Sequence, residues 1–288
     1  MSSGLVVLTA LGSALAAASS SVLQHRSARR TAAGGHSAMG SAATLLTRPL
    51  WLAGLAMAAL GLVLHTVALA GGQLAVVQPL LVSGLLFALP LSLVLEGRRP
   101  ALVEWLWALA LIAGLATFLG TARPSAGAVP PGTGVLAACT LIGSVLLVGA
   151  VALGYGPARE HKAAMLGTAG GIAFGVTSAL LKEVTAIGLS DVGRLLSSWP
   201  IYALVAIGAA GIGLTQLAYA AGPLASSLPA LTIGDPVAAV VIGAIAFHEN
   251  LVHTPLAVVL EIVAFAVMFA AAVALARRSV DAPALATA

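Results

Sequence analysis

The chain has 288 residues, of which 60% are hydrophobic and only 8% are charged, and its mean hydropathy is +1.08. A soluble domain carries about 25% charged residues, so this composition excludes a soluble globular protein and makes the lipid bilayer the expected partner. The formal net charge is +4, but basic and aromatic residues do not cluster as nucleic-acid binding requires. The single cysteine, Cys139, excludes an intramolecular disulfide.

The apolar segments predict nine transmembrane helices, because about 20 apolar residues cross the hydrocarbon core of a bilayer as a helix. Charged or Pro/Gly-rich loops such as 96–100 and 122–134 separate these segments. The predicted spans are 4–24, 49–70, 73–95, 102–121, 133–153, 163–187, 198–220, 224–247 and 255–276. In the first span the basic residues follow the apolar ones, which favours a retained helix over a cleaved signal peptide.

Lys and Arg are distributed unevenly between the two sides of the membrane. With the N-terminus outside, ten of the thirteen Lys and Arg residues lie on the inner side, and only Arg123, Lys182 and Arg194 lie outside. Inner loops of membrane proteins carry such an excess of positive charge. The sequence therefore predicts a multi-pass protein of the plasma (inner) membrane, with its N-terminus outside and its C-terminal tail, 277–288, in the cytoplasm.

Residues 64–81 have a near copy 150 positions later, at 214–231. The aligned residues are Leu64 and Leu214, Ala68 and Ala218, Gly72 and Gly222, Leu74 and Leu224, and Pro79 and Pro229. Glu96 and Glu249 close the two following helices and are interpreted as loop residues at opposite membrane faces. Helices rich in Ala, Leu and Gly resemble one another by chance, but the shared Gly, Pro and Glu positions favour a duplication.

The duplication divides the chain into a first membrane repeat, 4–121, a linker with the fifth span, 122–162, and a second membrane repeat, 163–276. Segment 14–24 loosely matches 171–181 and relates the first spans of the two copies. Four spans return the chain to its starting side and the fifth inverts it. The expected fold is therefore all-α and membrane-embedded, with two inverted four-helix repeats. Such repeats are typical of secondary transporters, whose cargo site lies near the midplane.

Several segments carry a family resemblance. Two proline-containing helices that end in Glu, QPLLVSGLLFALPLSLVLEGRRP at 78–100 and LPALTIGDPVAAVVIGAIAFHEN at 228–250, resemble the EamA-like group of the drug/metabolite transporter superfamily. SSVLQHRSAR after the first span and GIAFGVTSALLKEV in the sixth resemble the branch that includes the NIPA-type magnesium transporters and their actinobacterial relatives. The resemblance implies a secondary carrier with an inverted-repeat bundle, whose cargo is an amino acid, a nucleotide sugar, a cation or a drug.

Asp235 lies near the middle of an apolar span and is the first candidate for the cargo site. A carboxylate at that depth costs about 2.5–3.5 kcal/mol on insertion scales, so it needs a partner, a proton or a function. Pro229 and Pro236 bracket it, so the helix is expected to open there and to bind a cation or proton. Alternatively, Asp235 only caps a half-helix that begins at Pro236. Pro79 is the helix-breaking proline of the first copy.

Other acidic and basic residues in the spans are candidates for the substrate or ion pathway. Glu261 has no counter-charge among its helical neighbours, so it belongs either to the pathway or to the outer headgroup region. Lys182 and Glu183 end the sixth span, where snorkelling or a local ion pair explains them. Alternatively, Lys182 is the counter-ion of Asp235 or Glu261, or of an anionic cargo.

Uncharged polar residues supply further candidates. His65 in the second span could couple transport to protons, because histidine titrates near neutrality, but a hydrogen bond to another helix also explains it. Gln78, Thr215 and Gln216 line a polar path or join helices by hydrogen bonds. The glycines of the sixth span predict a close-packing surface, formed by Gly167, Gly170, Gly171 and Gly175.

The sequence contains no GK[ST] phosphate loop, no HExxH and no paired CxxC, so neither an ATP-driven pump nor a cofactor is expected. The function predicted is alternating-access transport of a small solute or cation, close to Asp235 and Glu261. One alternative is a Mg²⁺ transporter in which these two residues are the ligands, since Mg²⁺ keeps several waters and needs only one or two carboxylates. A second alternative is a non-transporting membrane partner in cell-envelope assembly. A homodimer is left open.

Overall fold

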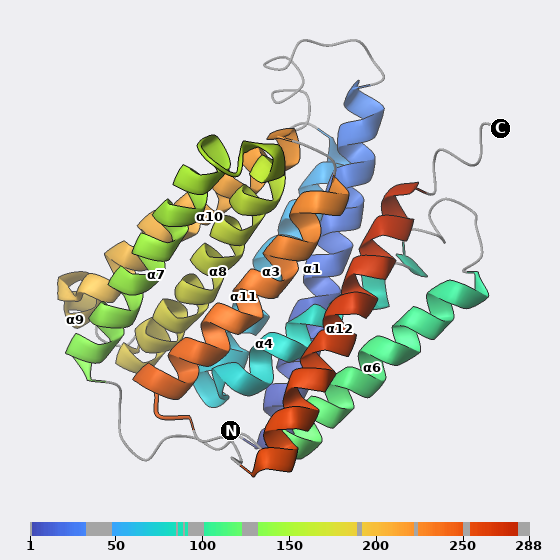
Figure 1. The fold of residues 1–288 in the computed structure, drawn as a ribbon. Helices are drawn as coiled ribbons and strands as arrows, with labels where there is room; N and C mark the ends of the chain where they lie inside the picture. Colours follow the sequence, from blue (N-terminus) through green and yellow to red (C-terminus); the bar gives the residue numbers. More distant parts are fainter. Residues whose placement is uncertain are drawn as a thin grey trace.

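The computed structural model of the chain describes residues 2–32, 48–84, 86–88, 90–91, 101–122, 132–188, 192–221, 224–249 and 254–281. Every regular element in these residues is a helix. The long helices form one bundle, in which α1 (Ser3–Ala32) begins at the lower end and α12 (Pro255–Asp281) ends at the upper end (Figure 1). The described part of the chain is therefore all-helical, as predicted.

Helices occur in all nine predicted ranges. Besides α1 and α12 they are α3 (Pro49–Gly71), α4 (Leu74–Val82), α6 (Leu102–Ala122), α7 (Thr133–Tyr155), α8 (Lys162–Ile187), α10 (Trp199–Ala221) and α11 (Leu224–Ala246). A 3-10 helix, η1 (Arg159–His161), and a short helix, α9 (Val192–Ser197), lie in connections that are predicted as loops. The apolar segments thus predict the positions of the long helices, and short helices within polar connections escape that reasoning.

Six of the described helices are long and apolar enough to cross a membrane, namely α1, α3, α6, α7, α8 and α12. In the predicted span 73–95, α4 ends at Val82 with a turn at Ser83, after which helical residues continue at 84, 86–88 and 90–91. The chain is therefore a multi-pass membrane protein with at least six helices of spanning length.

In the first half of the chain α1 packs against both α3 and α4. Gly61 of α3 lies against Ala16 and Ala17 of α1, since an added Cβ would approach Ala17 N to 3.4 Å and Ala16 Cβ to 3.5 Å. After α4, Gly84 lies against the carbonyl of Ala14, where an added Cβ would be 3.2 Å away. Contacts nearer the helix ends show that α1 runs antiparallel to α3 and parallel to α4.

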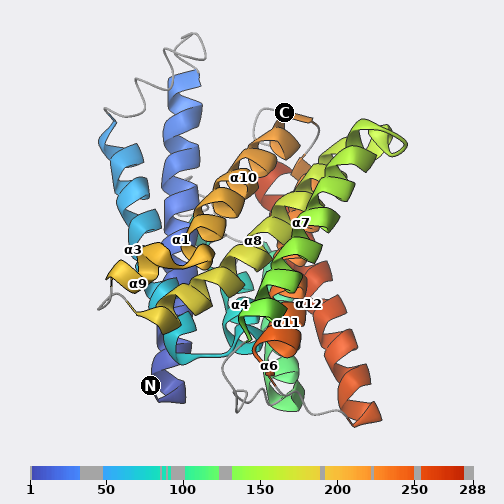
Figure 2. The same cartoon turned by 90° about the vertical axis from the view of Figure 1, so that its left-hand side faces the viewer.

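In the second half α8 packs in the same manner against α10 and α11. Gly211 of α10 lies against Ala173 and Phe174 of α8, where an added Cβ would approach their side chains to 3.1 and 3.2 Å. Gly234 of α11 lies against Gly171 of α8, with a Cβ-to-Cα distance of 3.0 Å. Thus α8 runs antiparallel to α10 and parallel to α11, and Figure 2 shows it between α7 and α10. The direction of α8 is opposite to that of α1 (Figure 1).

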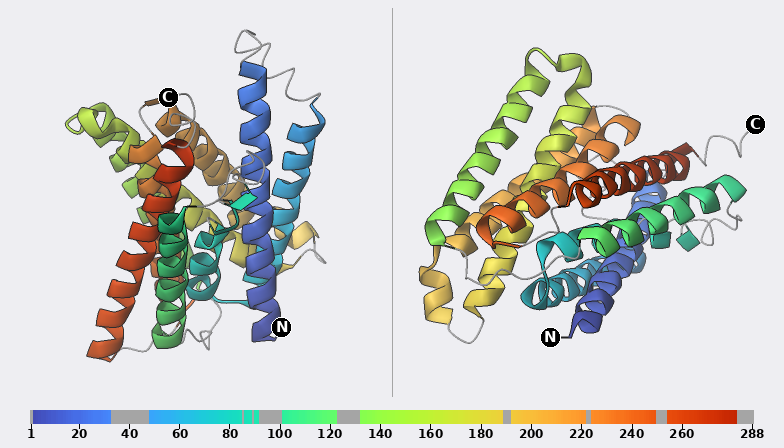
Figure 3. Two further views of the ribbon diagram at one scale, coloured as in Figure 1. Left: turned by 90° about the vertical axis from the view of Figure 1, so that its right-hand side faces the viewer. Right: turned by 60° about the horizontal axis from the view of Figure 1, so that its bottom comes forward.

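The two halves meet at two places. Helices α6 and α12 lie side by side (Figure 3), with the rings of Phe118 and Phe265 packed edge to face at a centroid distance of 4.9 Å. A buried apolar cluster joins α1, α4, α8 and α11, and includes Val6, Leu74, Leu180 and Ile242. Together these contacts place α11 at the centre of the bundle, between α8, α4 and α12.

Candidate functional site

Three glycines of α8 spaced by four residues contact the backbone of α11. They are Gly167, Gly171 and Gly175, and we call this contact the α8–α11 seam. A Cβ added to Gly171 would lie 2.7 Å from the carbonyl oxygen of Leu231 and 2.8 Å from Cα of Gly234. A Cβ added to Gly175 would lie 2.6 Å from the carbonyl oxygen of Asp235. Real Cβ atoms do not approach this closely, so only glycine allows the contact. The predicted close-packing surface of the sixth span is confirmed.

The seam brings Asp235 against α8. Helix α11 continues without interruption from Leu224 to Ala246, through Pro229 and Pro236. The expected opening of the helix at Asp235 is therefore wrong, and so is the alternative of a half-helix that begins at Pro236. A proline inside a helix removes one backbone hydrogen bond, which membrane helices tolerate. The Oδ1 atom of Asp235 is buried and has no hydrogen-bond partner among the described residues.

Glu261 lies on the opposite side of α11 from α8, in the wall of a cavity of about 390 Å³. Pro236 of α11, Phe118 of α6 and Phe265 of α12 line the same cavity. Glu261 is the one charged residue among the lining residues, and the others are apolar. Asp235 faces α8, whereas the residue after it faces this cavity. Asp235 is thus part of a turn of α11 that contacts α8 on one side and borders the cavity of Glu261 on the other.

A second cavity of about 850 Å³ lies between α7, α8 and α11. Its wall is largely apolar and includes Cys139, Thr168 and Gly234. Val237 and Phe269 line both cavities, so the two are neighbours across α11 and α12. The turn of α11 that carries Asp235 thus lies between two hollows in the bundle.

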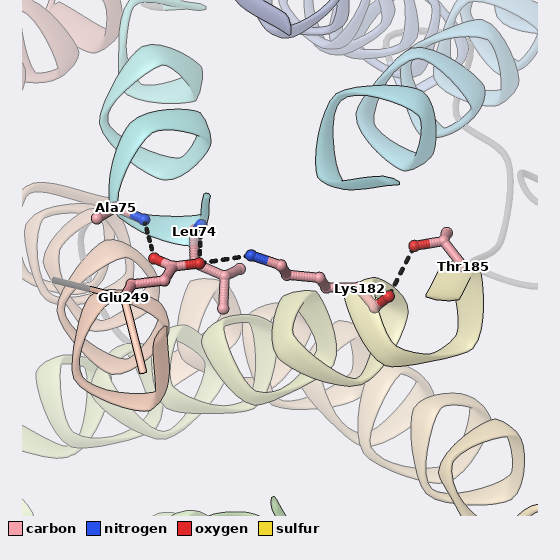
Figure 4. A network of polar contacts seen from close by, with 5 residues as sticks. All are labelled: Leu74, Ala75, Lys182, Thr185 and Glu249. Carbon is pink, nitrogen blue, oxygen red and sulfur yellow. Dashed lines mark hydrogen bonds and ion pairs between the residues drawn. The ribbon is translucent and has the colours of Figure 1, made fainter. Parts of the chain in front are cut away.

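A buried polar network centres on Glu249, just after α11 (Figure 4). Its side chain is 1% exposed, and its Oε1 accepts hydrogen bonds from the Lys182 ammonium at 2.5 Å and from the Leu74 N–H at 2.7 Å. Its Oε2 accepts the Ala75 N–H at 3.0 Å. Glu249 is a loop residue, as the sequence predicts, but its carboxylate is buried between the two halves of the bundle. Lys182 pairs with Glu249 rather than with Asp235 or Glu261.

The backbone after α11 holds Glu249 in this position. His248 has a φ of 51°, a left-handed conformation that turns the chain back, and the Glu249 N–H donates to the Gly243 carbonyl at 3.1 Å. A Cβ on Gly243 would lie 2.7 Å from Oε2 of Glu249, so glycine leaves room for the carboxylate. The Lys182 ammonium lies 4.8 Å from the centre of the Phe247 ring, a cation–π contact.

The sequence holds one signal for this network. Helix α4 begins after Gln73, which makes no side-chain hydrogen bond to the first turn, although a helix leaves its first N–H groups without partners. A buried helix start without a capping residue requires an acceptor from elsewhere. That signal calls for an acceptor, but it does not identify a residue 175 positions away.

Three uncharged candidates have buried positions. The Nε2 atoms of His65 in α3 and Gln78 in α4 are buried without a hydrogen-bond partner among the described residues. Thr215 donates its hydroxyl to the Gly211 carbonyl of its own helix at 2.9 Å, close to Gly170. Thr215 therefore contributes to the packing of α10 on α8, while His65 and Gln78 retain unused polar atoms.

The remaining candidates are less informative. Glu183 is half-buried near the end of α8. The side chains of Gln216 and Pro229, and the whole of Glu96, lie outside the described residues. Pro79 lies inside α4 and is buried. No group of three or more His, Cys, Asp or Glu side chains in the described part of the chain is placed to hold a metal ion.

Fold and site together define an all-helical, multi-pass membrane protein with acids buried among its helices. No family model matches the chain, and no solved structure matches it. The chain is 33% identical over 276 residues to the uncharacterized protein Cgl0250/cg0304 of Corynebacterium glutamicum, with 96% of each chain covered. It belongs to the same family as this corynebacterial protein.

Proposed function

We propose that the chain is a secondary transporter of the drug/metabolite type, built from two inverted four-helix repeats with α7 as the linker helix. The observation that carries this proposal is a pair of helix contacts that recurs at the repeat offsets. Gly61 and Gly84 in the first half lie 150 positions before Gly211 and Gly234 in the second. All four glycines are packing contacts with the first helix of their own half.

The residues of α1 and α8 that these glycines contact are also related by a constant difference in residue number. Ala14, which Gly84 touches, lies 157 positions before Gly171, which Gly234 touches. The partners of Gly61 and Gly211 are related by the same 157 positions, as Ala16 and Ala17 are to Ala173 and Phe174. Chance similarity of apolar helices does not account for equivalent contacts at both offsets. Because α8 runs opposite to α1, the related halves are inverted, which is the architecture of many secondary transporters.

The cargo route in this proposal passes the turn of α11 that carries Asp235. Its buried Oδ1 lacks a hydrogen-bond partner among the described residues, and Glu261 lines the neighbouring cavity. Ionisable groups inside the membrane are costly, and they mark ion and substrate pathways by default. Binding of a proton or cation at these carboxylates would bias the carrier between its inward and outward states.

Transport in proteoliposomes tests the proposal. Asp235→Asn is expected to reduce transport about tenfold or more while leaving the folded protein intact, because the amide keeps the shape but loses the titratable charge. Glu261→Gln, assayed separately, is expected to impair transport as well. The panel comprises amino acids, nucleotide sugars, organic amines, lipids and Mg²⁺, and a pH-sensitive dye inside the vesicles detects coupled proton movement.

Two outcomes separate this function from its alternatives. Growth of a Mg²⁺-auxotrophic strain on the wild-type protein, lost with Asp235→Asn, would identify Mg²⁺ as the cargo. If the wild-type protein moves nothing in the panel and both variants still complement a deletion strain, the transporter proposal fails. A non-transporting partner in envelope assembly would then be the better explanation.

Membrane orientation has its own test. We expect a reporter fused after Arg30 to be cytoplasmic, because Arg26, Arg29 and Arg30 lie on the inner side when the N-terminus is outside. A reporter fused at the C-terminus should also be cytoplasmic. An external signal from the fusion after Arg30 would contradict the inverted-repeat arrangement.

A further inference from the structure

The Glu249 network joins the two halves of the bundle. Leu74 and Ala75, whose N–H groups donate to the carboxylate, begin α4 in the first half, whereas Lys182 and Glu249 belong to the second half. All of these groups lie at the end of the bundle where α1 begins, because Gly72 packs against Val6. In the orientation proposed above this is the outer end.

Nothing else among the described residues replaces Glu249 at the start of α4. Gln73 makes no side-chain hydrogen bond to the first turn, so the carboxylate supplies the acceptors for two otherwise free N–H groups. The partial positive charge of a helix N-terminus also favours an anion at this point. If α4 moves away from α8 and α11, Glu249 loses these donors and α4 loses its cap, so separation requires water to enter at this end.

The side chain of Gln78 lies behind the network, one helical turn beyond Leu74 on the same face of α4. It is 1% exposed, and its Nε2 has no hydrogen-bond partner among the described residues. A buried amide donor without a partner is costly unless another state of the protein satisfies it. Gln78 is therefore the first polar group that water or cargo would meet if the two halves separated here.

We propose that Glu249, held by Lys182 and by the first N–H groups of α4, is the latch that keeps the outer side of the carrier closed. The structure is thus the outward-closed state, and opening to the outside breaks the contacts of Glu249 with α4. The proposal rests on the transporter function proposed above, and it assigns Lys182 and Glu249 to the control of access rather than to cargo binding.

Cysteine accessibility tests the latch without any cargo. Cys139 is the single cysteine of the chain, so Cys139→Ser gives a background in which Gln78→Cys is the only thiol. A membrane-impermeant methanethiosulfonate added outside should modify Gln78→Cys slowly. With Glu249→Gln in the same chain the rate should rise about tenfold or more, because loss of the latch shifts the population toward the open state.

Two further variants make the test specific. Lys182→Met removes the ammonium but leaves the carboxylate on α4, and we expect it to accelerate labelling less than Glu249→Gln; it also serves if Glu249→Gln does not fold. Glu104→Gln is the matched control, because Glu104 is a buried acid that accepts the Ala101 N–H at 2.6 Å at the start of its own helix, α6. Labelling should be unchanged in this control.

The latch proposal fails if Glu249→Gln and Lys182→Met both leave the labelling rate of Gln78→Cys unchanged. It also fails if Gln78→Cys is labelled equally fast when Glu249 and Lys182 are intact, or if labelling accelerates only with reagent added on the cytoplasmic side. The outcome is separable from that of the transport assays. Latch-dependent labelling in a protein that moves no cargo would overturn the transporter function and leave the access control standing. Transport by a protein whose labelling ignores the latch would overturn the latch alone.

Discussion

Gly171→Ala should strongly destabilise the folded bundle, as should Gly167→Ala and Gly175→Ala, because each added Cβ would meet a backbone carbonyl oxygen of α11. The Cβ added to Gly171 would lie 2.7 Å from the carbonyl oxygen of Leu231, and backbone atoms cannot move aside as a flexible side chain can. Helices α8 and α11 would have to separate. Overpacking of this kind costs about 1–3 kcal/mol, and we expect a cost near the upper end for each variant. Unfolding by sodium dodecyl sulfate, followed by circular dichroism, measures the change.

Gly149→Ala is the matched control for this prediction. Gly149 lies in α7, and a Cβ added to it meets nothing within 4 Å. Since alanine is favoured over glycine in helices by roughly 0.5–1 kcal/mol, this variant should be as stable as the wild-type protein or slightly more stable. Equal stability of Gly171→Ala and Gly149→Ala would contradict the close approach of α8 to α11.

Exchanging the two charges of the buried ion pair is not expected to restore the stability that is lost when Glu249 is replaced. Glu249→Ala leaves the Lys182 ammonium largely buried without its anion, and removal of one partner from a buried pair costs about 3–5 kcal/mol. In the exchanged protein, Lys182→Glu with Glu249→Lys, the ion pair can form again. A lysine at 249, however, cannot accept the N–H groups of Leu74 and Ala75, and it adds positive charge at a helix N-terminus.

A double-mutant cycle of the two exchanges, measured by the same unfolding assay, separates the contributions. We expect the exchanged protein to remain well below wild-type stability, close to the Glu249→Lys single variant. Recovery to near wild-type stability would mean that the ion pair alone matters and that the cap on α4 does not. Glu249→Asp, which retains the charge on a shorter side chain, should lie between the wild-type protein and Glu249→Ala.

Much of the fold follows from the sequence because the bilayer limits the possibilities to helices of a fixed length. The predicted range 255–276 contains most of α12, and 133–153 most of α7. The range 73–95 contains a turn at Ser83, after which helical residues resume at 84, 86–88 and 90–91. Apolar length alone does not reveal such a turn, since Ser83 lies in an otherwise continuous apolar segment.

Part of the packing around Asp235 was predictable from the sequence, and the local geometry of α11 was not. Burial of Asp235 in the bundle agrees with the expectation from its depth, and the glycines of the sixth span do form a packing surface. The local geometry at Pro236 differs, because α8 packs against α11 there and holds it as one helix. The preference of the residue before a proline for non-helical backbone geometry is weaker than the constraint that the packing of a neighbouring helix imposes.

The partner of Lys182 could not be predicted, because it depends on a turn after α11 and on the start of a helix in the other half. Glu249 follows the last helical residue of α11 by three positions, so its place in the sequence is that of a loop residue. The positive φ at His248 directs it back into the bundle. The residue types at 248 and 249, histidine and glutamate, do not predict such a turn.

The capping of α4 by Glu249 also bears on the order in which the protein is made. Ribosomes synthesise Leu74 well before Glu249, 175 residues later in the chain. During that interval the start of α4 has no native acceptor for its first N–H groups, although α8, which supplies Lys182, is made before Glu249. The start of α4 is therefore completed only when Glu249, between α11 and α12, has been made. An insertase or chaperone that shields α4 until then would act on the nascent chain between these two points.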